Sequence, residues 1–528
     1  MILGPICRTG LSRAKCLYTY TTRRTFALKN EDVVKSLQKY LNVTESAAQY
    51  LCIKHSYISK LDDSKIKDVI DGIYHLGFRK EDLVSHPILF LLHPVTLKFR
   101  YKVLQECGFS NIKPTHIVSY LNIVKRKTIN ELKESGDIYT IINLENRLAS
   151  FMTQWPTSLT NVIDGDIGEC SLYSLRIRII GRYLELVLDL AEDEFNRGLK
   201  TYPTIKHRPL GAINETISIL QSQIMMPAHK IKSNLYLLQL DPDNLKDIIV
   251  NFRSIGGIDI KEVIRMHPKI AMKNCSILFE IRKVLQDFGI SNEAQRRCFD
   301  IYTLGPNTIR ERIEYAKTIP EFITFYHHPR FLKMIHYKKT AIERLQHLYG
   351  NNKKCVSLNI LSGSAAHFEV FEKSPGDRLG KGKDLVFYVS QSLGKEYLKS
   401  DIHRMLKRHP FWINIPLVQV KYVYERLSKD FSNKDIFENC PIVLYPWSKV
   451  KEAIDYLNTS HSITTHLHDN LDLMKLSQSQ KLSIVLYYLE KNHYFSGNGV
   501  WGEEKSNKVI VDKPHLQDLK NVHMVQCV

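Results

Sequence analysis

Basic side chains recur beside a series of prolines that share the same flanking pattern. Arg265 and Lys269 stand on either side of Pro268, and Arg330 directly follows Pro329. Cations at such intervals suit a long polyanion, because each contact with a phosphate releases condensed counterions and adds affinity. They predict a nucleic-acid-binding strip if the segments that carry them stack on one another. The twelve candidates for phosphate contact are Arg265, Lys269, Arg296, Arg297, Arg310, Arg312, Arg330, Lys338, Lys339, Arg404, Lys407 and Arg408.

The distribution of charge supports nucleic-acid binding by these twelve cations as a group. For any one of them, the competing interpretation is a solvated surface charge. The chain of 528 residues has a formal net charge of +19. Residues 31–250 hold 27 basic against 26 acidic groups, and residues 431–528 hold 10 against 11. Residues 251–430 alone carry a net +13. Such a local excess favours a polyanionic partner for that segment.

Histidines precede four of these prolines and raise the alternative of a metal site. They are His86, His267, His328 and His409. Each belongs to a different copy of the pattern, whereas zinc needs its ligands about 2 Å from a single point. We therefore expect these histidines to be structural. A second group, His466, His468 and Asp469, has no cysteine beside it, and we expect a polar loop there.

A glycine-rich basic segment at residues 376–383, GDRLGKGK, superficially resembles a phosphate-binding loop. A true loop of that kind has four residues between its glycines, Ser or Thr after the lysine, and a strand before it. None of these conditions is met, so we expect a flexible basic loop. No catalytic residue, metal or cofactor is predicted, and we expect a protein that is not an enzyme.

The prolines belong to an internal repeat that positions these side chains. An apolar residue stands four positions before each proline and another stands two after it. The five prolines are Pro87, Pro268, Pro329, Pro410 and Pro441. Their separations are 181, 61, 81 and 31 residues, which indicates a unit of about 31 residues. Three copies also place a leucine seventeen residues after the proline: Leu104, Leu285 and Leu427.

Apolar residues within each copy follow helical spacing, which predicts two helices and a short helical turn per unit. Such a unit is too small to bury its own apolar face, so successive copies must stack. The fold class is therefore all-α, a curved solenoid. We expect partly degenerate repeats over 27–240, with a hinge or irregular packing around 200–240, and basic repeats over 241–500. Residues 350–383 read as an insertion, and residues 501–528 read as a tail.

The N-terminal segment has the composition of an organelle-targeting peptide. Residues 1–26 contain no Asp or Glu, spread arginines along their length and are rich in hydroxyl side chains. The run from Arg24 to Ala27 is typical of a matrix-processing site. These features predict a mitochondrial transit peptide at 1–26. No run approaches the 18 or so apolar residues that a membrane-spanning helix needs.

Three segments resemble a known family, the mitochondrial transcription termination factors. Residues 76–87, LGFRKEDLVSHP, are similar to its repeat, and residues 101–109, YKVLQECGF, look like its continuation. Residues 490–497, EKNHYFSG, resemble its insect members. The resemblance implies a left-handed solenoid whose basic groove lies along duplex nucleic acid, and a role in mitochondrial transcription termination without enzymatic activity.

Three functional classes remain open from the sequence. The first is a regulator in the mitochondrial matrix, at the nucleoid, that binds double-stranded mitochondrial DNA and blocks or pauses the RNA polymerase. The second is an RNA-binding factor for ribosome assembly or transcript handling, because basic charge serves either polymer. The third is a scaffold recruited by the transcription machinery or by another termination factor, for which the near-neutral residues 31–250 leave surface free.

Overall fold

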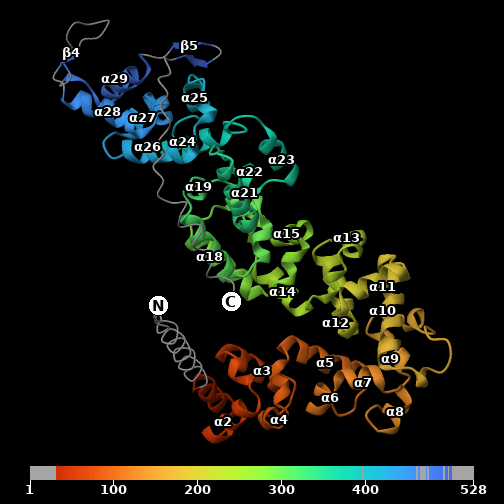
Figure 1. The fold of residues 1–528 in the computed structure, drawn as a ribbon. Helices are drawn as coiled ribbons and strands as arrows, with labels where there is room; N and C mark the ends of the chain where they lie inside the picture. Colours follow the sequence, from red (N-terminus) through yellow and green to blue (C-terminus); the bar gives the residue numbers. More distant parts are fainter. Residues whose placement is uncertain are drawn as a thin grey trace, which may run out of the picture. The chain divides into compact units, whose positions relative to one another are not determined.

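The structure is a computed structural model in which 71% of the chain is helical. It describes residues 31–394, 396–459 and 475–491, together with the strand residues 462–463, 471–472, 494–496 and 499–501 (Figure 1). The transit peptide predicted at 1–26, the tail from 502 onward and the group of His466, His468 and Asp469 lie outside the described residues. The described residues form two compact units, divided between residues 280 and 281.

The first unit begins with helical residues 31–41 and continues through short α- and 3₁₀-helices. Its first elements are α2 (Glu45–Lys54), η1 (Ile58–Lys60), α3 (Asp63–His75), α4 (Lys80–Ser85), η2 (Pro87–Leu91), α5 (Pro94–Glu106), α6 (Pro114–Val118), α7 (Tyr120–Arg126), α8 (Ile129–Glu134), α9 (Leu144–Ser150), η3 (Pro156–Leu159) and η4 (Ile167–Glu169). They are followed by α10 (Leu172–Leu188), α11 (Glu192–Thr201), η5 (Pro203–His207), α12 (Leu210–Ser218), the π-turn η6 (Ile219–Gln223), α13 (Ala228–Ser233), η7 (Leu235–Gln239), α14 (Pro242–Asn251), β1 (Ser254–Ile255), β2 (Ile258–Asp259), α15 (Ile260–Met266), η8 (Pro268–Met272) and the first part of α16 (Cys275–Asp287), within which the boundary between the units falls.

One repeat shows how the sequence pattern becomes structure. The carboxylate of Asp259 caps α15 by accepting from the amide of Lys261 at 2.8 Å. His267 ends that helix because its backbone is no longer helical, with φ −130° and ψ 72°. Pro268 then opens η8, where its fixed φ suits the first turn and its missing N–H costs no hydrogen bond. The longer α16 completes the unit, so the prediction of two helices and a short turn is confirmed.

The 3₁₀-helices stack in the first unit, with η5 contacting η7 and η7 contacting η8. These three begin at residues 203, 235 and 268, which are 32 and 33 residues apart. Within residues 200–240, where we expected a hinge or irregular packing, two 3₁₀-helices stack regularly, and the local irregularities are the π-turn η6 and Met225 with φ 57°. Pro203 opens η5 after Tyr202, whose φ of −122° and ψ of 67° closely match those of His267. Pro203 therefore opens its 3₁₀-helix in the same way as Pro268 does.

Residues 107–190 fold beside this stack rather than within it. Helix α5 contacts η5 directly, and Lys98 Nζ on α5 lies 3.3 Å from an oxygen of Asp241, 143 residues further along the chain. The guanidinium of Arg208 lies 4.3 Å above the Phe99 ring. The chain between these contacts forms α6 to α10, which explains why the proline pattern is interrupted there.

A buried ion pair joins α5, α10 and α12 at this junction. Glu106, at the end of α5, is 5% exposed, and Arg176 on α10 is fully buried. Arg176 Nη1 lies 3.2 Å from Glu106 Oε2. The same carboxylate accepts from the backbone amides of Leu210 at 2.8 Å and Gly211 at 2.9 Å, and so caps α12. A paired, fully hydrogen-bonded carboxylate is the form in which a buried charge is tolerated.

The second unit continues the same architecture to the C-terminal end of the described residues. Its first elements are α17 (Asn292–Arg297), η9 (Phe299–Thr303), α18 (Pro306–Lys317), α19 (Pro320–Ile323), α20 (Phe331–His336), α21 (Lys338–Gly350), α22 (Leu358–Ser362), α23 (Ala365–Lys373), α24 (Lys383–Leu393), α25 (Lys399–Leu406) and η10 (Trp412–Asn414). The remainder are α26 (Leu417–Leu427), α27 (Asn433–Glu438), η11 (Cys440–Leu444), α28 (Trp447–Thr459), β3 (Ser462–Ile463), β4 (Leu471–Asp472), α29 (Gln478–Glu490), β5 (Tyr494–Ser496) and β6 (Gly499–Trp501).

Second helices of neighbouring repeats pack on one another here, with α24 on α26 and α26 on α28. The strands form three antiparallel pairs, β1 with β2, β3 with β4 and β5 with β6. The leucines predicted at the repeat spacing, Leu104, Leu285 and Leu427, are all completely buried. The prediction of an all-α repeat solenoid is confirmed. None of the described helices is both long and apolar enough to span a membrane.

The predicted insertion contains regular structure of its own. Residues 350–383 include α22 and α23, and the glycine-rich segment follows α23. The carboxylate of Asp377 accepts from the backbone amides of Lys354 and Cys355, both at 2.8 Å. The amide of Leu379 donates to the carbonyl of Ile413 at 2.6 Å. Hydrogen bonds therefore hold the backbone at several positions of the segment that we expected to be a flexible loop.

Candidate nucleic-acid interface

Some arginines of the second unit bind carbonyl groups at helix ends. Arg312 Nη1 donates to the carbonyls of Ile335 at 3.2 Å and His336 at 2.6 Å, at the end of α20. Arg344 Nη1 donates to the carbonyl of Gly363 at 2.9 Å, at the end of α22. The last carbonyls of a helix have no partner within it and carry partial negative charge, so they attract cations. Arg312 was a candidate for phosphate contact, and its guanidinium instead caps a helix.

Three further candidates form ion pairs with acidic side chains. Arg310 lies 3.7 Å from Asp287, Lys339 lies 4.0 Å from Glu343, and Arg404 lies 3.1 Å from Asp401. The three cations are exposed, and such surface pairs contribute at most about 1 kcal/mol. A phosphate could replace the acid at each position, but part of the positive charge is already compensated.

Two candidates near α20 contact neutral groups. The guanidinium of Arg330 donates to Asn359 Oδ1 at 3.2 Å. The ammonium of Lys338 lies 3.7 Å from the centroid of the Tyr315 ring. Burial lowers the pKa of Lys338, with the nearby Arg312 adding to the effect. These two partners are uncharged, so they orient the cations on the protein without compensating their positive charge.

In the first unit, Arg265 on α15 is half-buried, and its Nε is buried without a hydrogen-bond partner among the described residues. Lys269 on η8 is exposed. On α17 of the second unit, Arg296 and Arg297 are both exposed.

Four of the twelve candidates are exposed and form no side-chain hydrogen bond or ion pair with the described residues. They are Lys269, Arg297, Lys407 and Arg408. Lys407 and Arg408 follow α25 directly, in the turn that leads to Pro410. An exposed cation without an acidic partner is the form that exchanges its counterions for a phosphate most readily. These four residues, which we call the open cations, are the best candidates for phosphate contact.

The histidines before the prolines take part in the ends of the short helices. His86 Nδ1 lies 3.2 Å from the carbonyl of Asp82 in α4. His328 Nδ1 accepts from the amide of Arg330 at 3.0 Å, and His409 Nδ1 accepts from the amide of Phe411 at 3.3 Å. No cluster of three or more His, Cys, Asp or Glu side chains suited to a metal ion occurs in the described part of the chain.

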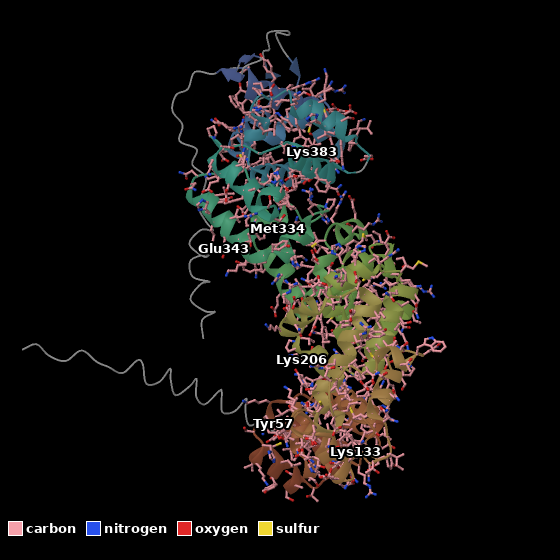
Figure 2. The ribbon with its side chains drawn as sticks, turned by 90° about the vertical axis from the view of Figure 1, so that its right-hand side faces the viewer. Tyr57, Lys133, Lys206, Met334, Glu343 and Lys383 are labelled. Carbon is pink, nitrogen blue, oxygen red and sulfur yellow. The ribbon has the colours of Figure 1, made fainter. Side chains whose placement is uncertain are left out.

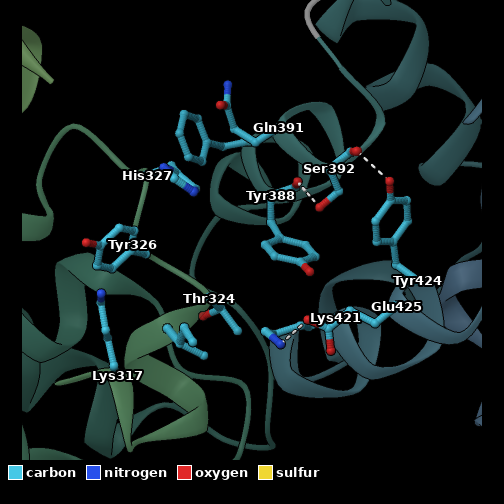
Figure 3. Close-up of a pocket in the computed structure, with 12 residues that line it drawn as sticks. Lys317, Thr324, Tyr326, His327, Tyr388, Gln391, Ser392, Lys421, Tyr424 and Glu425 are labelled. Atoms are coloured by element: carbon cyan, nitrogen blue, oxygen red, sulfur yellow. Dashed lines mark hydrogen bonds and ion pairs between the residues drawn. The ribbon is translucent and has the colours of Figure 1, made fainter. Parts of the chain in front are cut away.

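A cleft of about 550 Å³ opens between α18, α19, α24 and α26 of the second unit (Figure 3). Several aromatic side chains contribute to its lining, among them Tyr326, Tyr388 and Tyr424. The ammonium of Lys317 lies 5.1 Å from the Tyr326 ring, and Lys421 is paired with Glu425. Burial raises the pKa of Tyr388 to about 12, so its phenol is protonated at neutral pH. The cleft presents ring faces, and both of its lysines already have partners.

The residues that sequence reasoning missed are those whose partners are distant along the chain. Nothing near Glu106 or Arg176 in the sequence marks them as a buried pair 70 residues apart. Lys353 likewise donates to the carbonyls of Glu372 and Ser374, both at 2.7 Å. A cation of this kind can be told from a surface cation only when the position of its partner in another element is known, and the local sequence does not give that position.

The fold and the open cations together define the class of this molecule, an α-helical repeat protein with an excess of positive charge and regular 3₁₀ anchors. A comparison with known proteins agrees with that class. The chain is 31% identical over 459 residues to "Transcription termination factor 5, mitochondrial" of Drosophila melanogaster, which covers 86% of this chain and 81% of the Drosophila protein. No protein-family model matches the chain, and no solved structure matches it.

This extent of similarity establishes that the chain belongs to the family of mitochondrial transcription termination factors. The similarity is to the member numbered five, from an insect, in agreement with the resemblance of residues 490–497 to the insect members.

Proposed function

We propose that the protein binds double-stranded mitochondrial DNA and regulates transcription by terminating or pausing the mitochondrial RNA polymerase. The observation that carries this proposal is the similarity to the Drosophila termination factor, which extends over most of both chains. Its site of action is the nucleoid in the mitochondrial matrix. Residues 1–26 would act as the transit peptide that directs import of the protein into the matrix.

The open cations provide the physical basis for binding. Arg297, Lys407 and Arg408 are spread over different repeats of the second unit, and Lys269 lies in the first unit, so each unit presents exposed cations that can contact phosphates of a duplex. Many weak phosphate contacts make a complex that a polymerase must break progressively, and this is how a bound protein acts as a roadblock. The remaining candidates contribute according to their existing partners, with Arg312 contributing least because it caps α20.

The purified full-length chain tests this proposal by fluorescence anisotropy with mitochondrial duplex DNA at several salt concentrations. We expect the logarithm of the binding constant to fall linearly with the logarithm of salt, with a slope of about −0.9 for each phosphate contacted. Structured RNA of equal length provides the competitor, because its deep, narrow major groove excludes helices. Preference for RNA would favour an assembly or transcript-handling factor, and absence of binding to either polymer would favour a protein scaffold.

A further inference from the structure

The glycine-rich segment that follows α23 carries three exposed cations. They are Arg378, Lys381 and Lys383. Lys383, which is labelled in Figure 2, is the first residue of α24. None of them forms a side-chain hydrogen bond or ion pair with the residues that the structure describes. The sequence predicts only a flexible basic loop here, because the segment lacks the features of a phosphate-binding loop, and the three cations are not among the twelve candidates.

Direct contacts fix this segment against the turn after α25. The side-chain amide of Asn414 donates to the carbonyl of Asp377 at 2.9 Å, and the amide of Leu379 donates to the carbonyl of Ile413 at 2.6 Å. Gly382 lies against the Trp412 ring, so closely that a Cβ there would come within 2.0 Å of a ring carbon. The loop therefore packs on η10, a few residues beyond Lys407 and Arg408 in the chain.

Five cations consequently belong to two segments that are fixed to each other. We call this group, Arg378, Lys381, Lys383, Lys407 and Arg408, the cationic loop surface. The acids nearest to it in the sequence already have partners. Asp377 binds two backbone amides, Asp384 binds the amide of Leu358 at 3.0 Å, and Asp401 is paired with Arg404. Backbone amides are neutral, so Asp377 and Asp384 keep their negative charge, but the five cations outnumber these two acids and the surface keeps an excess of positive charge.

We propose that the cationic loop surface is a binding site for successive phosphates of duplex DNA and is the main source of affinity in the second unit. This inference rests on the proposed function and identifies the part of the protein that performs it. A phosphodiester backbone presents charges at fixed intervals, and a cationic array whose backbone is already ordered loses less conformational entropy on binding it. The segment that interrupts the repeats is therefore a functional element.

The test compares two triple variants of the full-length chain in the anisotropy titration. The first is Arg378→Gln/Lys381→Gln/Lys383→Gln. The second is a charge-matched control, Lys429→Gln/Lys434→Gln/Lys451→Gln, which changes exposed lysines outside the surface. We expect the first variant to reduce the magnitude of the salt slope by about 2.7 and the affinity at 0.1 M salt by roughly tenfold or more, from about 0.9 per lost contact. We expect the control to change affinity by less than about twofold.

A third variant separates the effect of the positive charges from the effect of the ordered loop backbone. Gly382→Val keeps all five cations but forces the loop away from Trp412, and we expect it to weaken DNA binding without changing the net charge. Circular dichroism and thermal unfolding establish that each variant is folded, and the single variants Lys381→Gln and Lys383→Gln replace the first triple variant if it is not.

The outcomes distinguish this inference from the proposed function. Failure of the unaltered protein to bind duplex DNA would overturn both. Normal binding by the unaltered protein, with equal losses in the first triple variant and its control, would overturn the inference alone. Loss of RNA binding but not of duplex binding in the first variant would also overturn it, because the surface would then recognise RNA.

Discussion

At the scale of single residues, cations of the same type have different roles according to their neighbours. Arg312 directs its guanidinium at two carbonyls, whereas Arg408 is exposed with no partner among the described residues. Both arginines were candidates for phosphate contact from the sequence, although only Arg408 lies close to a repeat proline. The structure therefore makes opposite predictions for the two.

We expect Arg312→Met to lower the free energy of unfolding by about 1.5–3 kcal/mol, because charged hydrogen bonds to the end of α20 are lost. The salt slope of DNA binding should remain unchanged. Arg408→Met should leave stability within about 0.5 kcal/mol and reduce the magnitude of the slope by about 0.9. Urea denaturation and anisotropy on both variants check the prediction. If Arg312→Met alters the slope more than Arg408→Met does, the assignment of roles is wrong.

His207 provides a prediction for pH. Burial lowers its pKa to about 4, and the positive charges of Lys125 and Arg176 add to the effect. Its unfolded value is about 6.5, so the unfolded chain takes up a proton first as the pH falls. The stability that depends on neutral His207 is therefore complete above about pH 6.5 and is lost as the pH falls toward 4.

The variant His207→Phe removes this titration. Between pH 7 and pH 5 we expect it to lose about 1 kcal/mol less stability than the unaltered protein does, since partial contact with water screens the charge. Urea denaturation at the two pH values measures the difference. Equal losses in both proteins would show that His207 is not the titrating group.

At the scale of elements, the 3₁₀ anchor explains both the success and the limit of sequence reasoning. Pro268 allows this copy of the repeat to be recognised in the sequence, and the structure of the copy agrees with the prediction. Leu235 and Phe299 open the equivalent helices η7 and η9 without proline. The first amide of such a helix needs no partner within the helix, so proline is favourable there but not required. Anchors without proline are therefore not visible in the sequence pattern.

Close packing at the end of α22 can be tested by adding a side chain at Gly363. A Cβ at Gly363 would lie 2.2 Å from the carbonyl oxygen of Asn359, which is backbone and cannot rotate away. We expect Gly363→Ala to lower stability by about 1–3 kcal/mol. The matched control is Gly350→Ala, at the end of α21, where a Cβ would meet no atom within 4 Å. It should be neutral or stabilising by up to about 1 kcal/mol.

Thermal unfolding of the two glycine variants distinguishes the outcomes. Equal melting temperatures for Gly363→Ala and Gly350→Ala would mean that α22 relaxes without cost. In that case Arg344, which donates to the Gly363 carbonyl, would not define the position of this helix end.

At the scale of the whole molecule, the all-α class and the repeat were predictable because periodic apolar residues are a local property of the sequence. The candidate site was predictable only as a region of excess charge. Which cations are open depends on partners in other repeats, as Lys98 with Asp241 and Arg176 with Glu106 show. The order in residues 376–383 also depends on distant groups, because Ile413 and Asn414 fix that segment.

The central claim, that this protein binds mitochondrial DNA to control transcription, is tested most directly inside mitochondria. Tagged full-length protein is crosslinked, and the bound DNA and RNA are recovered separately and sequenced. We expect discrete peaks on mitochondrial DNA that disappear when Arg297, Lys407 and Arg408 are replaced by glutamate. Peaks confined to ribosomal or messenger RNA, or no enrichment on either polymer, would contradict the account.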